Sequence, residues 1–192
     1  MTKRDVINMA LDSINLEAVD SSTNERTDIA KKAARWYETA ALYVLNYADW
    51  IDSIVHSTFT AEASITNFLD DQFEYVYELP SDCLRVLDLD LDPTALYVVE
   101  GNYLYTNLYD ATSGVNCRYI KDIRDESSGS MEYSDLLGEV IASRLAYNLA
   151  PVDQKGVYGA VFEDILFEAL NVNNRSDRWQ GGHINPFWTD VS

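Results

Sequence analysis

The spacing of apolar residues changes twice along the chain, and this change constrains the fold more than any other feature. Near both ends, apolar residues recur every three or four positions, which predicts helices. Between about residues 53 and 125, short runs rich in Thr, Tyr, Val and Phe alternate with turn residues, which predicts strands. The sequence therefore predicts an α+β fold with helices before and after a strand-rich region.

The two helices predicted in the first part of the chain both begin with a capping signal. The first covers residues 2–15, where Thr2 can cap the helix and Asp5 follows three residues later. The second covers residues 22–48 and begins with a similar signal at Ser22. Its apolar stripe is expected to face the core and consists of Ile29, Ala33, Trp36, Tyr37, Ala40, Val44 and Tyr47.

Two more helices are predicted after the strand-rich region. The third begins after Ser134 and ends before Pro151, which cannot continue a helix. The fourth covers residues 153–171. The economical arrangement is a bundle of all four helices. Its parts would be a bundle of residues 1–52 and 130–172, a β-rich insert of residues 53–129 between the second and third helices, and an extended C-terminal tail of residues 173–192.

The strand-rich region is expected to contain hairpins. Gly101 and Asn102 tolerate the positive φ of a tight turn, so they are expected to join two neighbouring strands. The predicted strands cover residues 74–79, 84–90, 95–100, 103–107 and 116–121.

The charge of the chain excludes some classes of partner. The 192 residues carry a formal net charge of −18, from 32 acidic and 14 basic side chains. Such a chain repels phosphate backbones and anionic membranes, so sequence-specific DNA binding is not expected. Cys83 and Cys117 lie far apart with no CxxC pair, which is typical of a reducing cytosol. We also expect no export signal and no membrane span.

Three acids on alternate positions, Asp88, Asp90 and Asp92, raise the possibility of a calcium loop. Position 6 of such a loop is normally Gly, but here it is Pro93, and position 12 is Val99. The intervening leucines give the period of a half-buried strand. We therefore expect a strand with leucines inward and acids outward, and no metal site.

The remaining motifs give no sign of catalysis. His56 and His183 lie in no zinc-binding pattern, and phosphate-loop and nucleophile-elbow motifs are absent from the sequence. Cys83 lies near Arg85, which could lower its pKa, but a lone Cys is more often a small buried residue. We expect no enzyme and no cofactor.

Three large aromatic residues lie in the aperiodic final segment: Trp179, Phe187 and Trp188. Such a segment cannot form a core of its own. These residues either fold back on the helices or bind another subunit, so they are the predicted protein-interaction residues.

The order of segments resembles the head-to-tail adaptor family of short-tailed bacteriophages, which is also called tail tubular protein A or gatekeeper. The resemblance covers nearly the whole chain and is carried by segments, not by active-site motifs. In order these are NERTDIAKKAARWYETAALYVLNYADW, FEYVYELPSDCLRVLDL, ALYVVEGNYLYTN, CRYIKDI and DLLGEVIASRLAYNLAP. The most specific is YELPSDCLRVL followed by VEGNYLYTN.

The resemblance implies a structural virion protein assembled in the host bacterial cytoplasm. Its copies would form a ring, usually dodecameric, that joins the portal to the tail nozzle and often the fibres. Genome ejection would proceed through the ring, and DNA would pass without specific binding. Two alternatives from other classes remain open: an acidic non-catalytic binding module (a DNA mimic or a chaperone-like protein) and an enzyme with an unrecognised carboxylate site.

Overall fold

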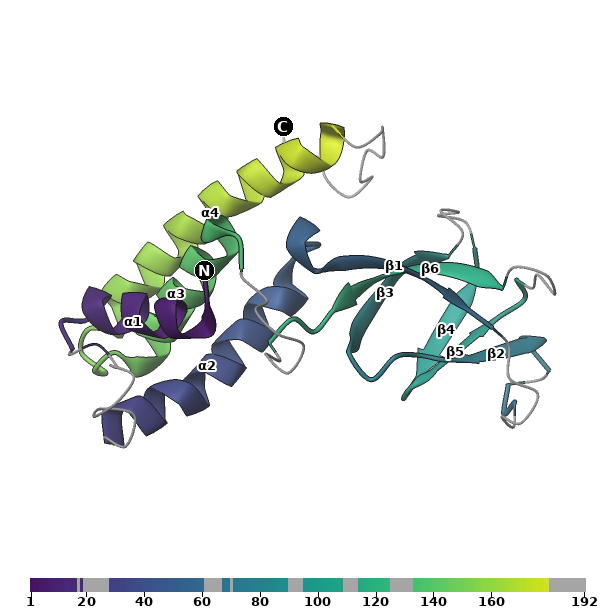
Figure 1. Cartoon of the computed structure of the whole chain (residues 1–192), viewed down its shortest axis with the longest axis horizontal. Coiled ribbons are helices and arrows are strands. Elements are labelled where there is room, and N and C mark those ends of the chain that lie inside the picture. The colour runs from purple at the N-terminus through teal and green to yellow at the C-terminus, as the bar shows by residue number, and fades with distance from the viewer. Residues whose placement is uncertain are drawn as a thin grey trace. The chain divides into compact units, whose positions relative to one another are not determined.

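The computed structural model describes residues 1–16, 18, 28–60, 67–69, 71–89, 95–108, 114–124 and 133–179, with side chains as far as residue 174. The described part is a mixed α and β protein with four α-helices and two small antiparallel sheets (Figure 1). The prediction that the chain mixes helices with strands is confirmed.

The chain divides into two compact units. We call Met1–Asp52 together with Glu126–Ser192 the helical unit, and Ser53–Asp125 the strand unit.

Helix α3 is the central element of the helical unit, because it packs against each of the other three helices. Its sequence is the most apolar of the four, and nine of its fifteen residues are buried. The helices are α1 (Lys3–Ser13), α2 (Asp28–Tyr47), α3 (Asp135–Leu149) and α4 (Lys155–Trp179), with a short 3-10 turn η1 (Ile51–Ser53) after α2.

The predicted caps of the first and third helices are present. The Thr2 hydroxyl accepts a hydrogen bond from the Asp5 amide, and the Asp5 carboxylate accepts one from the Thr2 amide, so both halves of a capping box form. The Ser134 hydroxyl accepts from the Leu137 amide at the start of α3. Helix α3 ends at the residue before Ala150, as expected from Pro151. The predicted cap at Ser22 lies outside the described residues.

The predicted apolar stripe of α2 is correct only in part. Ala33, Tyr37, Ala40 and Val44 are buried, together with Ala30, Ala41 and Leu45. Ile29, Trp36 and Tyr47 were expected in the core but are 44%, 38% and 52% exposed. The buried face is centred on the small residues that let α3 approach closely. The large side chains therefore lie on one flank of the helix.

The fourth helix is longer than predicted, since it ends at Trp179 and not at residue 171. The first residues of the predicted extended tail are therefore helical. Asn173 explains part of the difference, because it is buried and its amide binds the end of the α2 region. Its Nδ2 donates to the Asp49 carbonyl at 2.9 Å, and its Oδ1 accepts from the Ile51 amide at 3.1 Å. These two hydrogen bonds hold the part of α4 beyond residue 171, its predicted end, against the residues that follow α2.

The strand unit contains two three-stranded antiparallel sheets. The orders are β1-β6-β3 and β2-β5-β4, so β6 and β5 are the central strands. Strand β1 was not predicted, and its pairing partner β6 lies far away in the sequence. The strands are β1 (Ile54–Phe59), β2 (Tyr75–Glu78), β3 (Cys83–Leu89), β4 (Tyr97–Glu100), β5 (Tyr103–Thr106) and β6 (Val115–Lys121).

The predicted hairpin is present between β4 and β5. Glu100 pairs with Tyr103, which leaves Gly101 and Asn102 as a two-residue turn. Gly101 has φ of +60°, the left-handed conformation that favours glycine.

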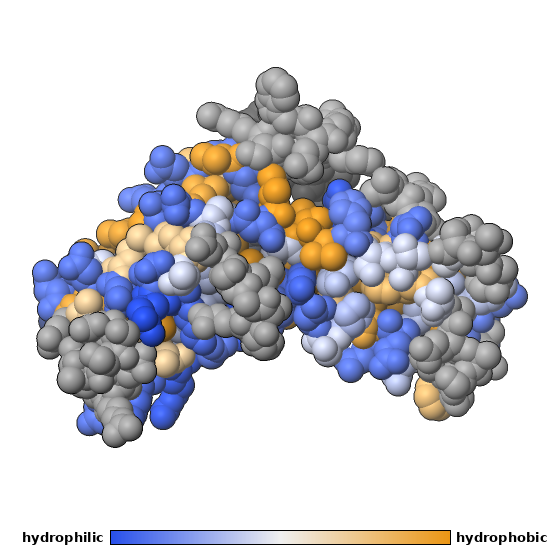
Figure 2. Space-filling model, viewed as in Figure 1, coloured by the Kyte–Doolittle hydropathy of each residue, from blue (hydrophilic) through white to orange (hydrophobic). Residues whose placement is uncertain are grey.

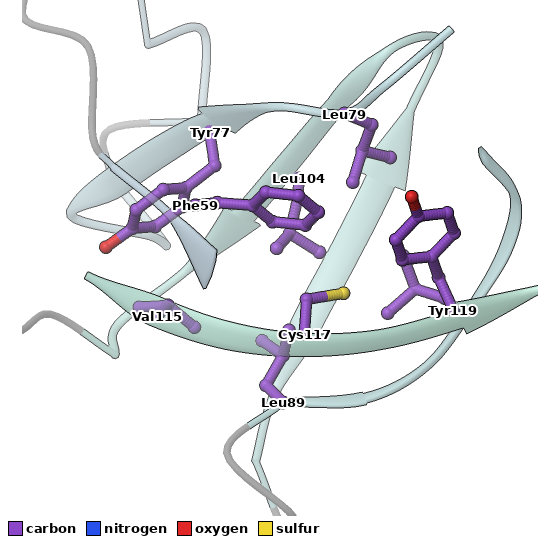
Figure 3. Close-up of a cluster of buried hydrophobic side chains, with 9 residues drawn as sticks. Phe59, Tyr77, Leu79, Leu89, Leu104, Val115, Cys117 and Tyr119 are labelled. Carbon is purple, nitrogen blue, oxygen red and sulfur yellow. The ribbon is translucent and has the colours of Figure 1, made fainter. Parts of the chain in front are cut away.

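Side chains from both sheets form one hydrophobic core in the strand unit (Figure 3). Phe59 from β1, Tyr77 from β2 and Leu104 from β5 meet side chains from β3 and β6. Tyr77 and Leu104 are fully buried. This unit therefore has a core that does not depend on the helices.

Strand β3 contains the first of the three alternating acids. Leu89 is fully buried, as predicted. Asp88 faces away from it but is not freely solvated, because Arg118 on β6 forms an ion pair with it at 3.0 Å. Asp90 and Asp92 lie outside the described residues. The register of β3 shifts twice, between Cys83 and Arg85 and again before Asp88, so a simple alternation does not hold along the strand.

Candidate protein-interaction site

The helical unit contains a pocket between α2, α3 and α4, with a volume of about 520 Å³. Four of its eleven lining residues are aromatic, and two basic side chains line it as well. We call it the Arg144 pocket; it is lined by Tyr43, Tyr47, Arg144, Tyr147, Lys155, Gly156, Gly159, Ala160, Phe162, Glu163 and Leu166.

Helical spacing places these side chains together. Tyr43 and Tyr47 are one turn apart on α2, and Arg144 and Tyr147 are three residues apart on α3, so each pair shares a helix face. On α4, Gly159 faces the Tyr147 ring, and a Cβ there would be in ordinary van der Waals contact with it at 3.5 Å. Small residues of α4 therefore lie opposite large residues of α3 in this pocket.

Arg144 lies at the centre of the aromatic cluster. Its guanidinium carbon is 3.9 Å from the ring centroid of Tyr43, 4.9 Å from that of Tyr147 and 5.2 Å from that of Phe162. The rings of Tyr43 and Phe162 contact edge to face, with centroids 6.2 Å apart. Cation–π contacts of this kind contribute about 0.5–2 kcal/mol each. The aromatic rings therefore hold the guanidinium in place.

The pocket has cationic groups that are not neutralised by acids of the described residues. Within that part of the chain, neither Arg144 nor Lys155 forms an ion pair, and the Nε of Arg144 is buried with no hydrogen-bond partner. Lys155 lies over the Tyr147 ring, 5.3 Å from its centroid. Glu163 lines the same pocket but is not paired with either base. Since a buried donor without a partner is unfavourable, an acidic group from outside would be stabilised here.

Two rows of exposed apolar side chains run beside the pocket. The α2 flank consists of Ile29, Trp36, Tyr43 and Tyr47, which are between 38% and 52% exposed. The α4 flank consists of Val157, Val161 and Val172, which are between 42% and 65% exposed. Figure 2 shows hydrophobic residues along the edge of the helical unit that α4 forms. Because the members of each row lie on one side of their helix, they offer apolar contacts to a partner.

The predicted interaction residues are not brought together in the described part of the chain. Trp179 is the last residue of α4, but its side chain is not described. Phe187 and Trp188 lie outside the described residues. The residues of the Arg144 pocket were not predicted from the sequence. The available signal was the Arg-x-x-Tyr spacing at Arg144 and Tyr147, a cation and a ring on one face of an otherwise apolar helix.

The strand unit has a smaller groove, of about 250 Å³, on the side of its first sheet away from the core. His56, Arg118 and Asp88 form a row across β1, β6 and β3, because each is the cross-strand partner of the next. Arg118 binds Asp88 and is therefore already neutralised. His56 is exposed, and His183 lies outside the described residues. The described walls of this groove are polar but contain no group prepared for catalysis.

The cysteines and acids of the described residues do not form a reactive or metal-binding site. Burial raises the pKa of the Cys83 thiol to about 11, and the neighbouring Asp82 acts in the same direction. A thiol of this kind is protonated at neutral pH and is a poor nucleophile. In the part of the chain that the structure describes, no three His, Cys, Asp or Glu side chains are grouped so that they could hold a metal ion.

None of the described helices combines the length and the apolar character needed to span a lipid bilayer. No family model matches the chain, and no curated protein sequence is significantly similar to it.

Proposed function

We propose that the chain is a structural protein of a bacteriophage virion that forms a ring at the head–tail junction. The ring would join the portal to the tail nozzle or fibres and surround the DNA exit channel. The observation that carries this proposal is the pair of exposed apolar flanks on α2 and α4. The specific role comes from the order of sequence segments, which resembles that of the head-to-tail adaptor family.

The two flanks favour a protein that works by association. A monomer rarely exposes rows of large apolar side chains, because water disfavours continuous apolar surface. The α2 flank and the α4 flank differ in composition, since the first is mainly aromatic and the second consists of valines. Contacts between two different surfaces of neighbouring copies are heterologous, and they close into a ring when the rotation between copies allows it. We propose a dodecamer.

We further propose that the four helices form a bundle and that the strand unit is a β-rich insert between its second and third helices. The packing of α3 against α1, α2 and α4 supports the bundle. All six described strands lie between α2 and α3 in the sequence, which supports the insert. In a ring, the bundles would supply contacts between neighbours, and the strand units would be available to the portal or the tail.

The acidic composition supports a role in DNA passage. Each copy carries a formal net charge of −18, so a ring of copies would repel the phosphate backbone at short range. Because of this repulsion, the genome would slide through the channel without specific binding. The ring would have no catalytic role and would need no cofactor.

Electron microscopy and light scattering of the full chain, alone and mixed with the portal of the same virus, test the proposal. We expect rings in at least one of the two samples. Trp36→Glu should abolish them, because it places a charge on the α2 flank while leaving the buried face of the helix unchanged.

Lys31→Gln is the matched control for that variant. It also makes the chain more negative by one charge, but Lys31 lies five residues before Trp36, about 140° around the helix. This variant should still form rings. A chain that stays monomeric with and without the portal would overturn the proposal, and co-purification with a DNA-binding protein would then indicate an acidic binding module.

A further inference from the structure

We propose that residues 180–192 of one copy bind in the Arg144 pocket of a neighbouring copy. Phe187 and Trp188 would pack on the aromatic walls, and the Asp190 carboxylate would bind Arg144 and Lys155. This inference rests on the proposed assembly of copies into a ring and names one of the contacts that hold neighbours together.

The pocket defines the chemistry of its occupant. Its walls contain the rings of Tyr43, Tyr147 and Phe162, which favour aromatic groups with edge-to-face or stacked contacts. Arg144 and Lys155 are basic and, among the described residues, have no acidic partner, so they favour a carboxylate. The occupant should therefore carry large aromatic side chains and an acid a few residues away.

The segment 180–192, QGGHINPFWTDVS, has this composition. Phe187 and Trp188 are adjacent, and Asp190 follows two residues later. The other segments outside the described residues contain no pair of large aromatic side chains. Pro186 restricts the backbone just before the aromatic pair, which lowers the entropy lost when the segment binds.

Chain length favours binding to a neighbour over folding back on the same copy. Helix α4 rises about 1.5 Å per residue, so Phe162 lies about 26 Å from the helix end at Trp179. Trp188 is nine residues beyond Trp179 and can reach at most about 32 Å from it when fully extended. To reach Phe162 in its own copy, the segment would need a sharp reversal and about four fifths of its full extension. A neighbouring copy imposes no such limit.

Site-specific photo-crosslinking in the full chain tests this contact. A benzoylphenylalanine introduced at position 187 would crosslink to whatever surrounds it on illumination. An equal mixture of chains with light and heavy isotopes shows by mass spectrometry whether the two joined peptides come from different copies. We expect mixed light–heavy crosslinks between position 187 and residues of the Arg144 pocket.

Charge variants show whether the acid and the bases act together. Asp190→Asn should reduce the yield of these crosslinks about tenfold, because it removes the charge-assisted contact. Arg144→Gln with Lys155→Gln should do the same, and circular dichroism shows whether that variant is folded. Asp190 lies outside all described elements, so its substitution tests the contact without touching them. Asp177→Asn is the matched control: it removes the same charge on α4, close to the segment in sequence, and should leave the yield unchanged.

The outcomes separate this inference from the proposed function. Rings without crosslinks to the pocket, or with crosslinks only within one chain, would overturn the docking and leave the ring proposal intact. Crosslinks that survive Asp190→Asn at full yield would also contradict it. The absence of both rings and mixed crosslinks, with and without the portal, would remove the proposed function together with the inference.

Discussion

The strand unit and the helical unit differ in where their large apolar side chains lie. In the strand unit, Tyr77 and Leu104 are fully buried between two sheets; the exposed Phe68 and Leu96 lie outside the strands, and Val99 of β4 is 41% exposed. In the helical unit, exposed side chains line up along α2 and α4 beside a pocket with two basic groups. The strand unit thus completes its core within its own chain, whereas the helical unit leaves surfaces for a partner. Association is therefore expected to depend mainly on the helices.

Replacement of a buried leucine by alanine in each core should show the difference between the two units most clearly. Leu104 in the strand unit and Leu145 in the helical unit are both fully buried. Each substitution should lower the free energy of unfolding of its own unit by about 2–5 kcal/mol, through lost burial and a cavity. Hydrogen exchange followed by mass spectrometry reports this for each segment.

The two variants should differ in assembly. Leu145→Ala should weaken ring formation, because it loosens the packing of α3 that supports both flanks. Leu104→Ala should leave assembly unchanged while the helical unit remains folded. If either variant lowered hydrogen-exchange protection equally in both units, the two units would unfold together. That result would contradict the proposal that each unit has a core of its own.

Glycine substitutions test the strand unit at its turns. Gly114 has φ of +72°, and an added Cβ would lie 2.5 Å from the Phe59 carbonyl oxygen. Gly101 has φ of +60° but has open space around it. Gly114→Ala should therefore cost about 2–3 kcal/mol and Gly101→Ala about 1 kcal/mol. Urea denaturation measures both, and a Gly101→Ala effect equal to or larger than that of Gly114→Ala would contradict the contact at Phe59.

Local signals predicted much of the fold. Helices α1 and α3 were placed correctly because caps such as Thr2 and Ser134 and the stop at Pro151 act on neighbouring residues. The turn at Gly101 was predictable for the same reason. These features need only a few residues of sequence to take effect.

The features that sequence analysis missed depend on distant parts of the chain. Strand β1 is stabilised by pairing with β6, and the end of α4 by the bonds of Asn173 to the region after α2. The buried face of α2 is decided by where α3 packs, which left Trp36 exposed. The Arg144 pocket combines three helices, so the spacing of Arg144 and Tyr147 on α3 was not enough to predict it. Periodicity shows which helix has an apolar face but not which part of that face a neighbour covers.

Alkaline pH should weaken the strand unit. Burial raises the pKa of Cys83 to about 11 and that of Tyr119 to about 12, from ordinary values of 9.0 and 10.0. A group with a raised pKa stabilises the folded form below its ordinary pKa, and this stabilisation is lost as pH rises toward the folded value. The free energy of unfolding should therefore fall between about pH 9 and pH 12.

Urea midpoints measured across this range check the alkaline prediction. Cys83→Ala removes one titrating group, so its midpoint should fall less steeply with pH than that of the wild type. A wild-type midpoint that is constant above pH 9, or an equally steep fall in the variant, would show that burial of the thiol is not the cause.

The smallest effect is expected at an ion pair on the strand unit. Hydrogen bonds from Arg124 lower the pKa of Asp122, whose Oδ1 accepts from Arg124 Nε at 2.8 Å. The pair is partly exposed, so Asp122→Asn should cost less than about 1 kcal/mol at neutral pH. A lowered pKa stabilises the folded form above the ordinary value of 3.8, and this contribution disappears as pH falls through the folded value. Urea midpoints of wild type and variant should therefore converge in acid.

A second ion pair in the same unit provides the comparison for this prediction. Asp82→Asn removes a longer pair, 3.4 Å from Lys121, and should have a smaller effect at neutral pH than Asp122→Asn. Because both pairs lie in the strand unit, neither substitution should alter ring assembly. A loss of rings in either variant would show that this unit takes part in association, since neither change touches the exposed flanks of α2 and α4.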